Sequence, residues 1–147
     1  MDDGDLRVRN LTYQLFADRN RPPSCADVAI AAKTTIAATR ASWRRLHDAR
    51  AIVLDGHTGE LRMAHPFSAV PTRFQVHTAG RRWFANCAWD AFGLCAALHS
   101  DGPIDTSCAE CAEPIGCSVE GERVADDGTV FHCLVPAAGW WDDIVHT

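Results

Sequence analysis

The chain has 147 residues, a formal net charge of −5 at pH 7, and 47% hydrophobic and 22% charged residues, which is the composition of an ordinary globular protein. It holds no stretch of about 18 apolar residues, and its acidic N-terminus lacks the apolar core of a signal peptide. We therefore expect neither a membrane span nor secretion, but a cytoplasmic protein whose seven cysteines are metal-binding, catalytic or buried thiols rather than disulfides.

Three helices and a hairpin are predicted over the first half of the chain. Near the N-terminus, apolar residues recur at helical spacing. Ser24 and Asp27 form a capping box that opens a second helix, and a third helix is expected over about residues 35–49. Residues 51–63 then alternate around a glycine-containing turn, which is typical of two paired strands. This is the order of a winged helix-turn-helix, and we expect it to form a domain of residues 1–66.

The charge of the chain changes sign along its length. The first 85 residues hold thirteen Lys and Arg against eight Asp and Glu, whereas the rest hold one Arg against eleven acidic residues. Arginines on the third helix of such a domain suggest contacts with DNA phosphates. The alternative is a helical packing domain whose arginines are solvated, because the positive excess is small. The histidines of this half are expected in surface or capping roles; they are His47, His57, His65 and His77.

A second hairpin and an alanine-rich helix are predicted next. Residues 72–87 alternate in hydrophobicity on either side of a turn at residues 78–80. The helix is expected over about residues 87–98, with Asn86 as its N-cap. Four tryptophans are expected to line the core or a pocket; they are Trp83, Trp89, Trp140 and Trp141.

Cys87 and Asp90 would be neighbours on the first turn of this helix, because they are three residues apart. A helix N-terminus lowers the pKa of a thiol, which favours Cys87 as a thiolate. Apolar neighbours such as Trp89 would desolvate Asp90 and raise its pKa. The pair would then join a soft metal ligand to a general acid. The alternative is a buried cysteine beside an aspartate that caps the helix or pairs with an arginine.

A third hairpin is predicted to carry Cys108 and Cys111 at its apex. A Cys-x-x-Cys turn is half of a structural zinc site, which needs a second pair of ligands. The candidates for that pair are Cys117, Cys133 and His132. An apolar strand at residues 130–135 and a helix beginning near Trp140 are expected to follow.

Several segments together resemble the organomercurial lyases, also called alkylmercury lyases. They are NCAWDAFG at residues 86–93, TSCAECAEPI at 106–115, and LVP followed by WWDDIVHT at the C-terminal end. We accordingly expect an α+β fold, in which a three-helix winged-helix-like domain packs on a small mixed α/β domain of residues 67–147. We also expect no membrane partner and either a monomer or a homodimer.

The resemblance implies the chemistry as well. A cysteine and an aspartate with the spacing of Cys87 and Asp90 cleave the carbon–mercury bond in that family, with no organic cofactor. The cysteine binds mercury as a thiolate and the aspartate donates the proton. The hydrocarbon leaves, and Hg(II) passes to cellular thiols or a mercuric reductase, as mercury detoxification requires. Cys108 matches a family cysteine regarded as structural.

The family's second mercury-binding thiol matches the position directly after Thr147, where the sequence ends. Three explanations are open: a chain cut short, a repurposed homologue, or a stop codon that the cell reads as selenocysteine. If the end is genuine, an internal thiol would take this role. The candidates are Cys133, Cys117 and Cys111.

Two other functions remain open. The protein could be a metal-responsive regulator that binds DNA through the winged helix and a metal ion through its cysteines, without turnover. It could also be a folded remnant that binds metal stoichiometrically. DNA is a partner only in the first of these.

Overall fold

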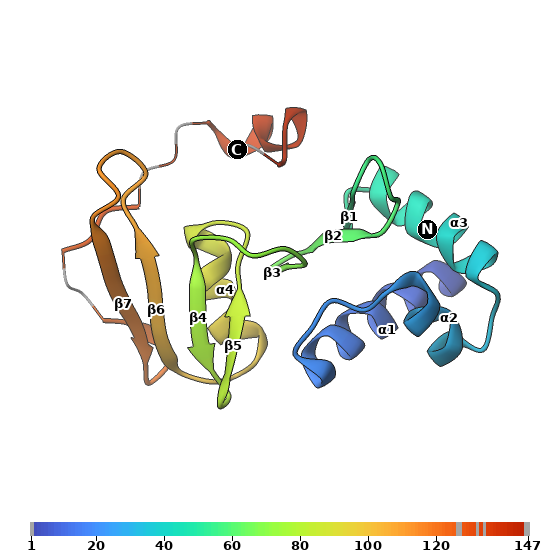
Figure 1. Ribbon diagram of the computed structural model, residues 1–147, viewed down its shortest axis with the longest axis horizontal. Helices are drawn as coiled ribbons and strands as arrows, with labels where there is room; N and C mark the ends of the chain where they lie inside the picture. The colour runs from blue at the N-terminus through green and yellow to red at the C-terminus, as the bar shows by residue number, and fades with distance from the viewer. Residues whose placement is uncertain (1, 126–127, 132, 134, 146–147) are drawn as a thin grey trace.

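Figure 1 shows a computed structural model of the protein, which describes residues 2–125, 128–131, 133 and 135–145. The fold is α+β, as expected. Helices gather in the N-terminal half, and an antiparallel sheet with one helix against it forms most of the C-terminal half (Figure 1). None of the described helices is long and apolar enough to cross a membrane.

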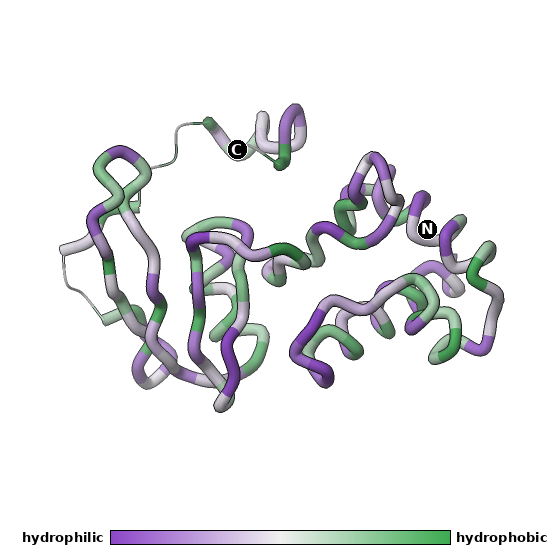
Figure 2. Tube along the Cα trace, viewed as in Figure 1, coloured by the Kyte–Doolittle hydropathy of each residue, from purple (hydrophilic) through white to green (hydrophobic). Residues whose placement is uncertain are grey.

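The three predicted N-terminal helices are α1 (Asp3–Arg19), α2 (Cys25–Ala32) and α3 (Ile36–Asp48). Each begins where a side chain accepts a hydrogen bond from a free backbone N–H of its first turn. These caps are Asp2, Ser24 and Thr35, and the capping box of Ser24 with Asp27 is present. The end of α1 and the two residues after it, 18–21, are hydrophilic and exposed (Figure 2).

A small antiparallel sheet follows in the order β1-β2-β3. Its strands are β1 (Val53–Leu54), β2 (Leu61–Ala64) and β3 (Phe67–Ser68), so the hairpin predicted at residues 51–63 is confirmed. The expected domain boundary after residue 66 falls between β2 and β3, which pair with each other. This sheet therefore joins the two halves. That the N-terminal half is a winged-helix domain stays a prediction.

The C-terminal half is built on a five-stranded antiparallel sheet in the order β5-β4-β6-β7-β8. Its strands are β4 (Gln75–Thr78), β5 (Arg81–Phe84), β6 (Gly102–Ser107), β7 (Pro114–Glu120) and β8 (Arg123–Val124). Helix α4 (Ala88–Ala97) crosses from β5 to β6 and packs on β4 and β6 (Figure 1). The second and third predicted hairpins and the alanine-rich helix are therefore confirmed.

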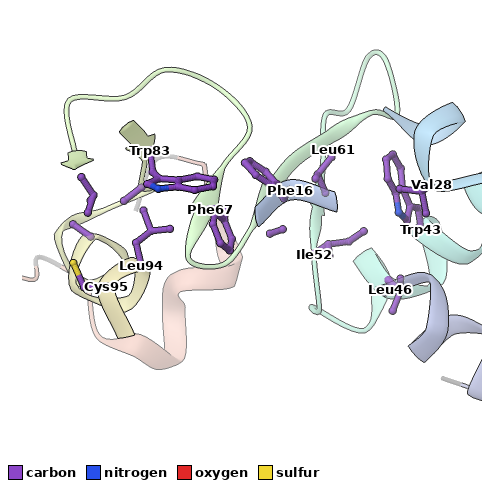
Figure 3. Close-up of a cluster of buried hydrophobic side chains, with 14 of the residues drawn as sticks. Phe16, Val28, Trp43, Leu46, Ile52, Leu61, Phe67, Trp83, Leu94 and Cys95 are labelled. Atoms are coloured by element: carbon purple, nitrogen blue, oxygen red, sulfur yellow. The ribbon is translucent and has the colours of Figure 1, made fainter. Parts of the chain in front are cut away.

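One hydrophobic core runs through both halves. Phe16 of α1 stacks on Phe67 of β3 with ring centroids 4.9 Å apart, and Phe67 meets Trp83 of β5 edge-on at 5.4 Å (Figure 3). On the other side of Phe16, the core continues to Trp43 and Leu46 of α3, both fully buried. The elements that carry the site are therefore held by one packed interior.

Two expectations at the C-terminal end are wrong. The described residues between 130 and 135 form no strand, and Val130 is 84% exposed. An apolar run alone does not supply a neighbouring edge to pair with, and β8 has only two residues. The helix expected from Trp140 is a 3₁₀ helix, η1 (Ala137–Asp142), that begins three residues earlier. His132 lies outside the described residues.

Candidate active site

The start of α4 brings Cys87 and Asp90 together, as their spacing predicts. The predicted N-cap is wrong, because Cys87 and not Asn86 occupies that position, with an extended backbone. The Cys87 sulfur accepts a hydrogen bond from the backbone N–H of Asp90 at 3.5 Å. The thiol thus lies against the first turn, next to the aspartate.

Asn86 has a different role that the sequence did not reveal. Its Nδ2 donates to Oδ2 of Asp90 at 2.8 Å. The same nitrogen lies 3.4 Å from the carbonyl oxygen of Pro66 and 3.3 Å from that of Phe67. Three acceptors around one nitrogen determine how the amide is oriented. Asn86 therefore ties the carboxylate of α4 to the segment between β2 and β3.

His65 is the second partner of Asp90, and the expected surface or capping role for this histidine is wrong. Its Nδ1 lies 3.2 Å from Oδ2 of Asp90. The side chain of Asp90 is 13% exposed and that of His65 is 31% exposed, so the pair is largely shielded from water. No local pattern in the sequence singles out His65, because the two residues are far apart along the chain.

The free Cys87 thiol is protonated more readily than expected. Burial raises its pKa, and the nearby Asp90 and Cys133 act in the same direction. Hydrogen bonds from the backbone N–H groups of Asp90 and Trp89 oppose this shift but do not outweigh burial. The prediction that the helix N-terminus makes Cys87 a thiolate is therefore wrong for the unliganded protein.

Aromatic side chains from distant segments surround the site, although not in the way that the sequence predicted. Trp89 is 64% exposed and does not desolvate Asp90; its ring lies 6.5 Å from that of Phe131. Trp141 of η1 meets the His65 ring edge-on at 6.0 Å. Trp83 is buried in the core. The C-terminal segment thus contacts His65, the partner of Asp90, from outside α4.

The other candidate ligands lie apart from this centre, except for one. Cys108 and Cys111 occupy the turn between β6 and β7, where hydrogen bonds from the backbone N–H groups of Cys111 and Glu110 lower the pKa of Cys108. Cys117 lies on β7 and is half-buried. Cys133 is exposed and lies close enough to Cys87 to raise its pKa.

No group of three His, Cys, Asp or Glu in the described part of the chain is placed to hold a metal ion. A structural zinc site at Cys108 and Cys111 thus stays a prediction, and no described residue supplies the second pair of ligands that it needs. The position of the expected second mercury thiol, after Thr147, lies outside the described residues.

The protein thus has an α+β fold in which a thiol and a carboxyl lie side by side at the start of one helix. Comparison with known families gives the family: the alkylmercury lyase model matches residues 67–147. This match covers more than half of the chain, and the protein belongs to the alkylmercury lyase family. Cys87, Asp90 and Asn86 lie inside the matched region, whereas His65 precedes it.

A solved structure, described as the mercury-bound form of MerB2, shares the fold with a TM-score of 0.66 and 22% sequence identity. The similarity covers 86% of this chain and 60% of that one, so this chain spans about three fifths of that protein's length. No curated protein matches the chain in sequence.

Proposed function

We propose that this protein cleaves the carbon–mercury bond of organomercurials by protonolysis and releases a hydrocarbon and Hg(II). The observation that carries the proposal is the juxtaposition of Cys87 and Asp90 at the start of α4, within the region that matches the lyase family. A thiol suits mercury because soft sulfur ligands select soft metals.

In the first step, Cys87 would bind the organomercurial cation. The S–H bond breaks, a sulfur–mercury bond forms, and the proton passes to the carboxylate of Asp90. The raised pKa of Cys87 fits this order, because the thiol then still carries the proton when the substrate arrives. The carboxylate beside it is a suitable base.

In the second step, Asp90 would return this proton to the carbon atom bound to mercury. The electron pair of the carbon–mercury bond forms the new C–H bond, and the hydrocarbon leaves. Hg(II) stays on the Cys87 sulfur, and the Asp90 carboxylate is regenerated. Cellular thiols or a mercuric reductase would then accept Hg(II).

The test is methane release from methylmercury with excess thiol, measured in the headspace. Asp90→Asn should keep mercury binding and lose methane release by at least about 10²-fold, because general acid catalysis contributes that much or more. Cys87→Ser should lose both. Asp105→Asn is the matched control, since this carboxyl is 66% exposed on β6. Equal methane release from Asp90→Asn and wild type would refute the mechanism.

A second thiol would help to hold Hg(II) after the hydrocarbon leaves. Among the internal candidates that the structure describes, Cys133 is the one whose charge raises the pKa of Cys87. The same assay with a chain extended by one cysteine after Thr147 separates the two sources. Methane that Cys133→Ser abolishes in the original chain would identify Cys133, whereas methane from the extended chain alone would identify the added position.

The alternative is a metal-responsive DNA-binding regulator. The observation that favours it is a hollow between α3 and the β1–β2 turn, lined by Arg40, Arg44 and His47 among others. Arg40 is already paired with Glu60 at 2.9 Å, which reduces the free positive charge there. DNA binding that weakens steeply with salt would support this function, and no binding at low salt would exclude it.

A further inference from the structure

We propose that His65 is a positioning residue that, together with Asn86, holds Oδ2 of Asp90 and leaves Oδ1 as the oxygen that carries the catalytic proton. This inference rests on the proposed lyase function. His65 lies outside the residues that match the family, so the match assigns it no role.

Two nitrogen atoms lie within hydrogen-bond distance of a single oxygen of Asp90. Nδ2 of Asn86 lies 2.8 Å from Oδ2, and Nδ1 of His65 lies 3.2 Å from the same atom. Both contacts are made by Oδ2, and no described residue donates a hydrogen bond to Oδ1. When His65 carries its hydrogen on Nδ1, a proton on Oδ2 would face two N–H groups, so the proton of the neutral carboxyl belongs on Oδ1.

The shorter of two contacts at Nδ1 favours one tautomer of His65, because Nδ1 lies 3.2 Å from Oδ2 of Asp90 and 3.5 Å from Nδ2 of Asn86. An ionised carboxylate only accepts hydrogen bonds, so the neutral imidazole must carry its hydrogen on Nδ1 to make this one. Nε2 is then the unprotonated nitrogen, and this atom is buried with no hydrogen-bond partner among the described residues. The ring is therefore held by Asp90 and by the edge-on contact with Trp141.

The backbone around His65 is packed closely enough to make this position precise. A Cβ atom at Gly93 of α4 would lie 3.2 Å from Cβ of Pro66, which is tighter than ordinary van der Waals contact. Gly93 thus lets α4 approach the His65–Pro66 segment. Asn86 holds the same segment through its contacts with the carbonyl oxygens of Pro66 and Phe67. The N-terminal half consequently sets the orientation of a carboxyl that belongs to the other half.

The first experiment compares two substitutions of His65 in single-turnover methane release. His65→Leu removes the donor and should lower the rate of protonolysis by about 10²-fold, the loss that a small misplacement of a catalytic group causes. His65→Asn places an amide nitrogen near the position of Nδ1 and should restore most of the rate. Mercury binding at Cys87 should stay unchanged in both, because only the proton donor is disturbed.

His77→Leu is the matched control. His77 forms a second histidine–aspartate pair, with Asp105 at 3.1 Å, on strands β4 and β6. Its loss should not alter the rate. A wild-type rate in His65→Leu would overturn the proposal. So would equal losses in His65→Leu and His65→Asn accompanied by weaker mercury binding, because that result indicates a structural role only.

The second experiment does not need turnover. Nitrogen-15 NMR at about pH 8, where an ordinary histidine is neutral, should show His65 with its hydrogen on Nδ1 in the wild type. Asp90→Leu should lose this preference. A wild-type His65 with its hydrogen on Nε2 would overturn the positioning role. Absence of methane from the wild type together with the Nδ1–H tautomer would instead refute the lyase function and leave the hydrogen bond established.

Discussion

The Cys87 thiol shows how two opposing effects compete at a single residue. The first turn of α4 offers backbone N–H groups that favour a thiolate, and burial among apolar neighbours favours the neutral thiol. Burial prevails at Cys87. At Cys108, which lies in a turn, similar N–H groups act with little desolvation, and its pKa is lowered instead. The pKa of a cysteine thiol is thus shifted in opposite directions at these two positions.

This difference predicts a pH dependence of thiol alkylation. Because the pKa of Cys87 is raised, its thiolate should appear only above the pH at which an unperturbed cysteine ionises. Cys108 should ionise below that pH, because its pKa is lowered. Iodoacetamide labelling across pH, read by mass spectrometry of the two peptides, measures both midpoints. A midpoint for Cys87 below that of Cys108 would contradict the competition described above.

Among the secondary-structure elements, the pairing of β4 with β6 is what adds the strands that follow α4 to the C-terminal sheet. Gly102 begins β6, and a Cβ atom there would lie 1.9 Å from the backbone oxygen of His77 on β4. Only glycine permits this approach, since the obstacle is backbone and not a flexible side chain. Gly116 on β7 meets nothing within 4 Å at the equivalent test position.

We therefore expect Gly102→Ala to lower the free energy of unfolding by about 1–3 kcal/mol or more, as overpacking does. Gly116→Ala is the matched control on the neighbouring strand and should change stability much less. Urea denaturation followed by far-UV circular dichroism measures both. Similar losses in the two variants would mean that the close approach of β4 and β6 is not what makes glycine necessary.

At the scale of the whole molecule, the two halves share one interior. Phe16 of α1 contacts Phe67 of β3, and Phe67 also contacts Trp83 of the larger sheet (Figure 3). His65 and Pro66 lie directly before β3. The core that joins the halves is therefore also what keeps the histidine beside Asp90.

Phe16→Ala should consequently destabilise the protein as a unit. The expected loss is about 3–5 kcal/mol of unfolding free energy, the usual cost of removing a buried phenylalanine. Tryptophan fluorescence and far-UV circular dichroism should show coincident transitions at a lower denaturant concentration. Two separate transitions would show that the halves unfold independently.

The elements of this protein follow from signals within short stretches of its sequence. The capping box at Ser24, the hairpin at residues 51–63 and the Cys-x-x-Cys turn were all predictable because each depends on neighbours a few residues away. The spacing of Cys87 and Asp90 on one helical turn has the same origin. Where a local signal lacks a partner, as in the apolar run at residues 130–135, the prediction failed.

What the local sequence could not determine is which distant groups meet. Burial of Cys87 reverses the pKa shift that a helix N-terminus alone would cause, and burial depends on the packing of other segments. His65 and Asn86 share Oδ2 of Asp90 only because β2, β3 and α4 are brought together by the common core. The sequence by itself therefore determined the helix that carries the thiol and the carboxyl. The tertiary structure decided their protonation and orientation, because both depend on contacts between residues far apart in the chain.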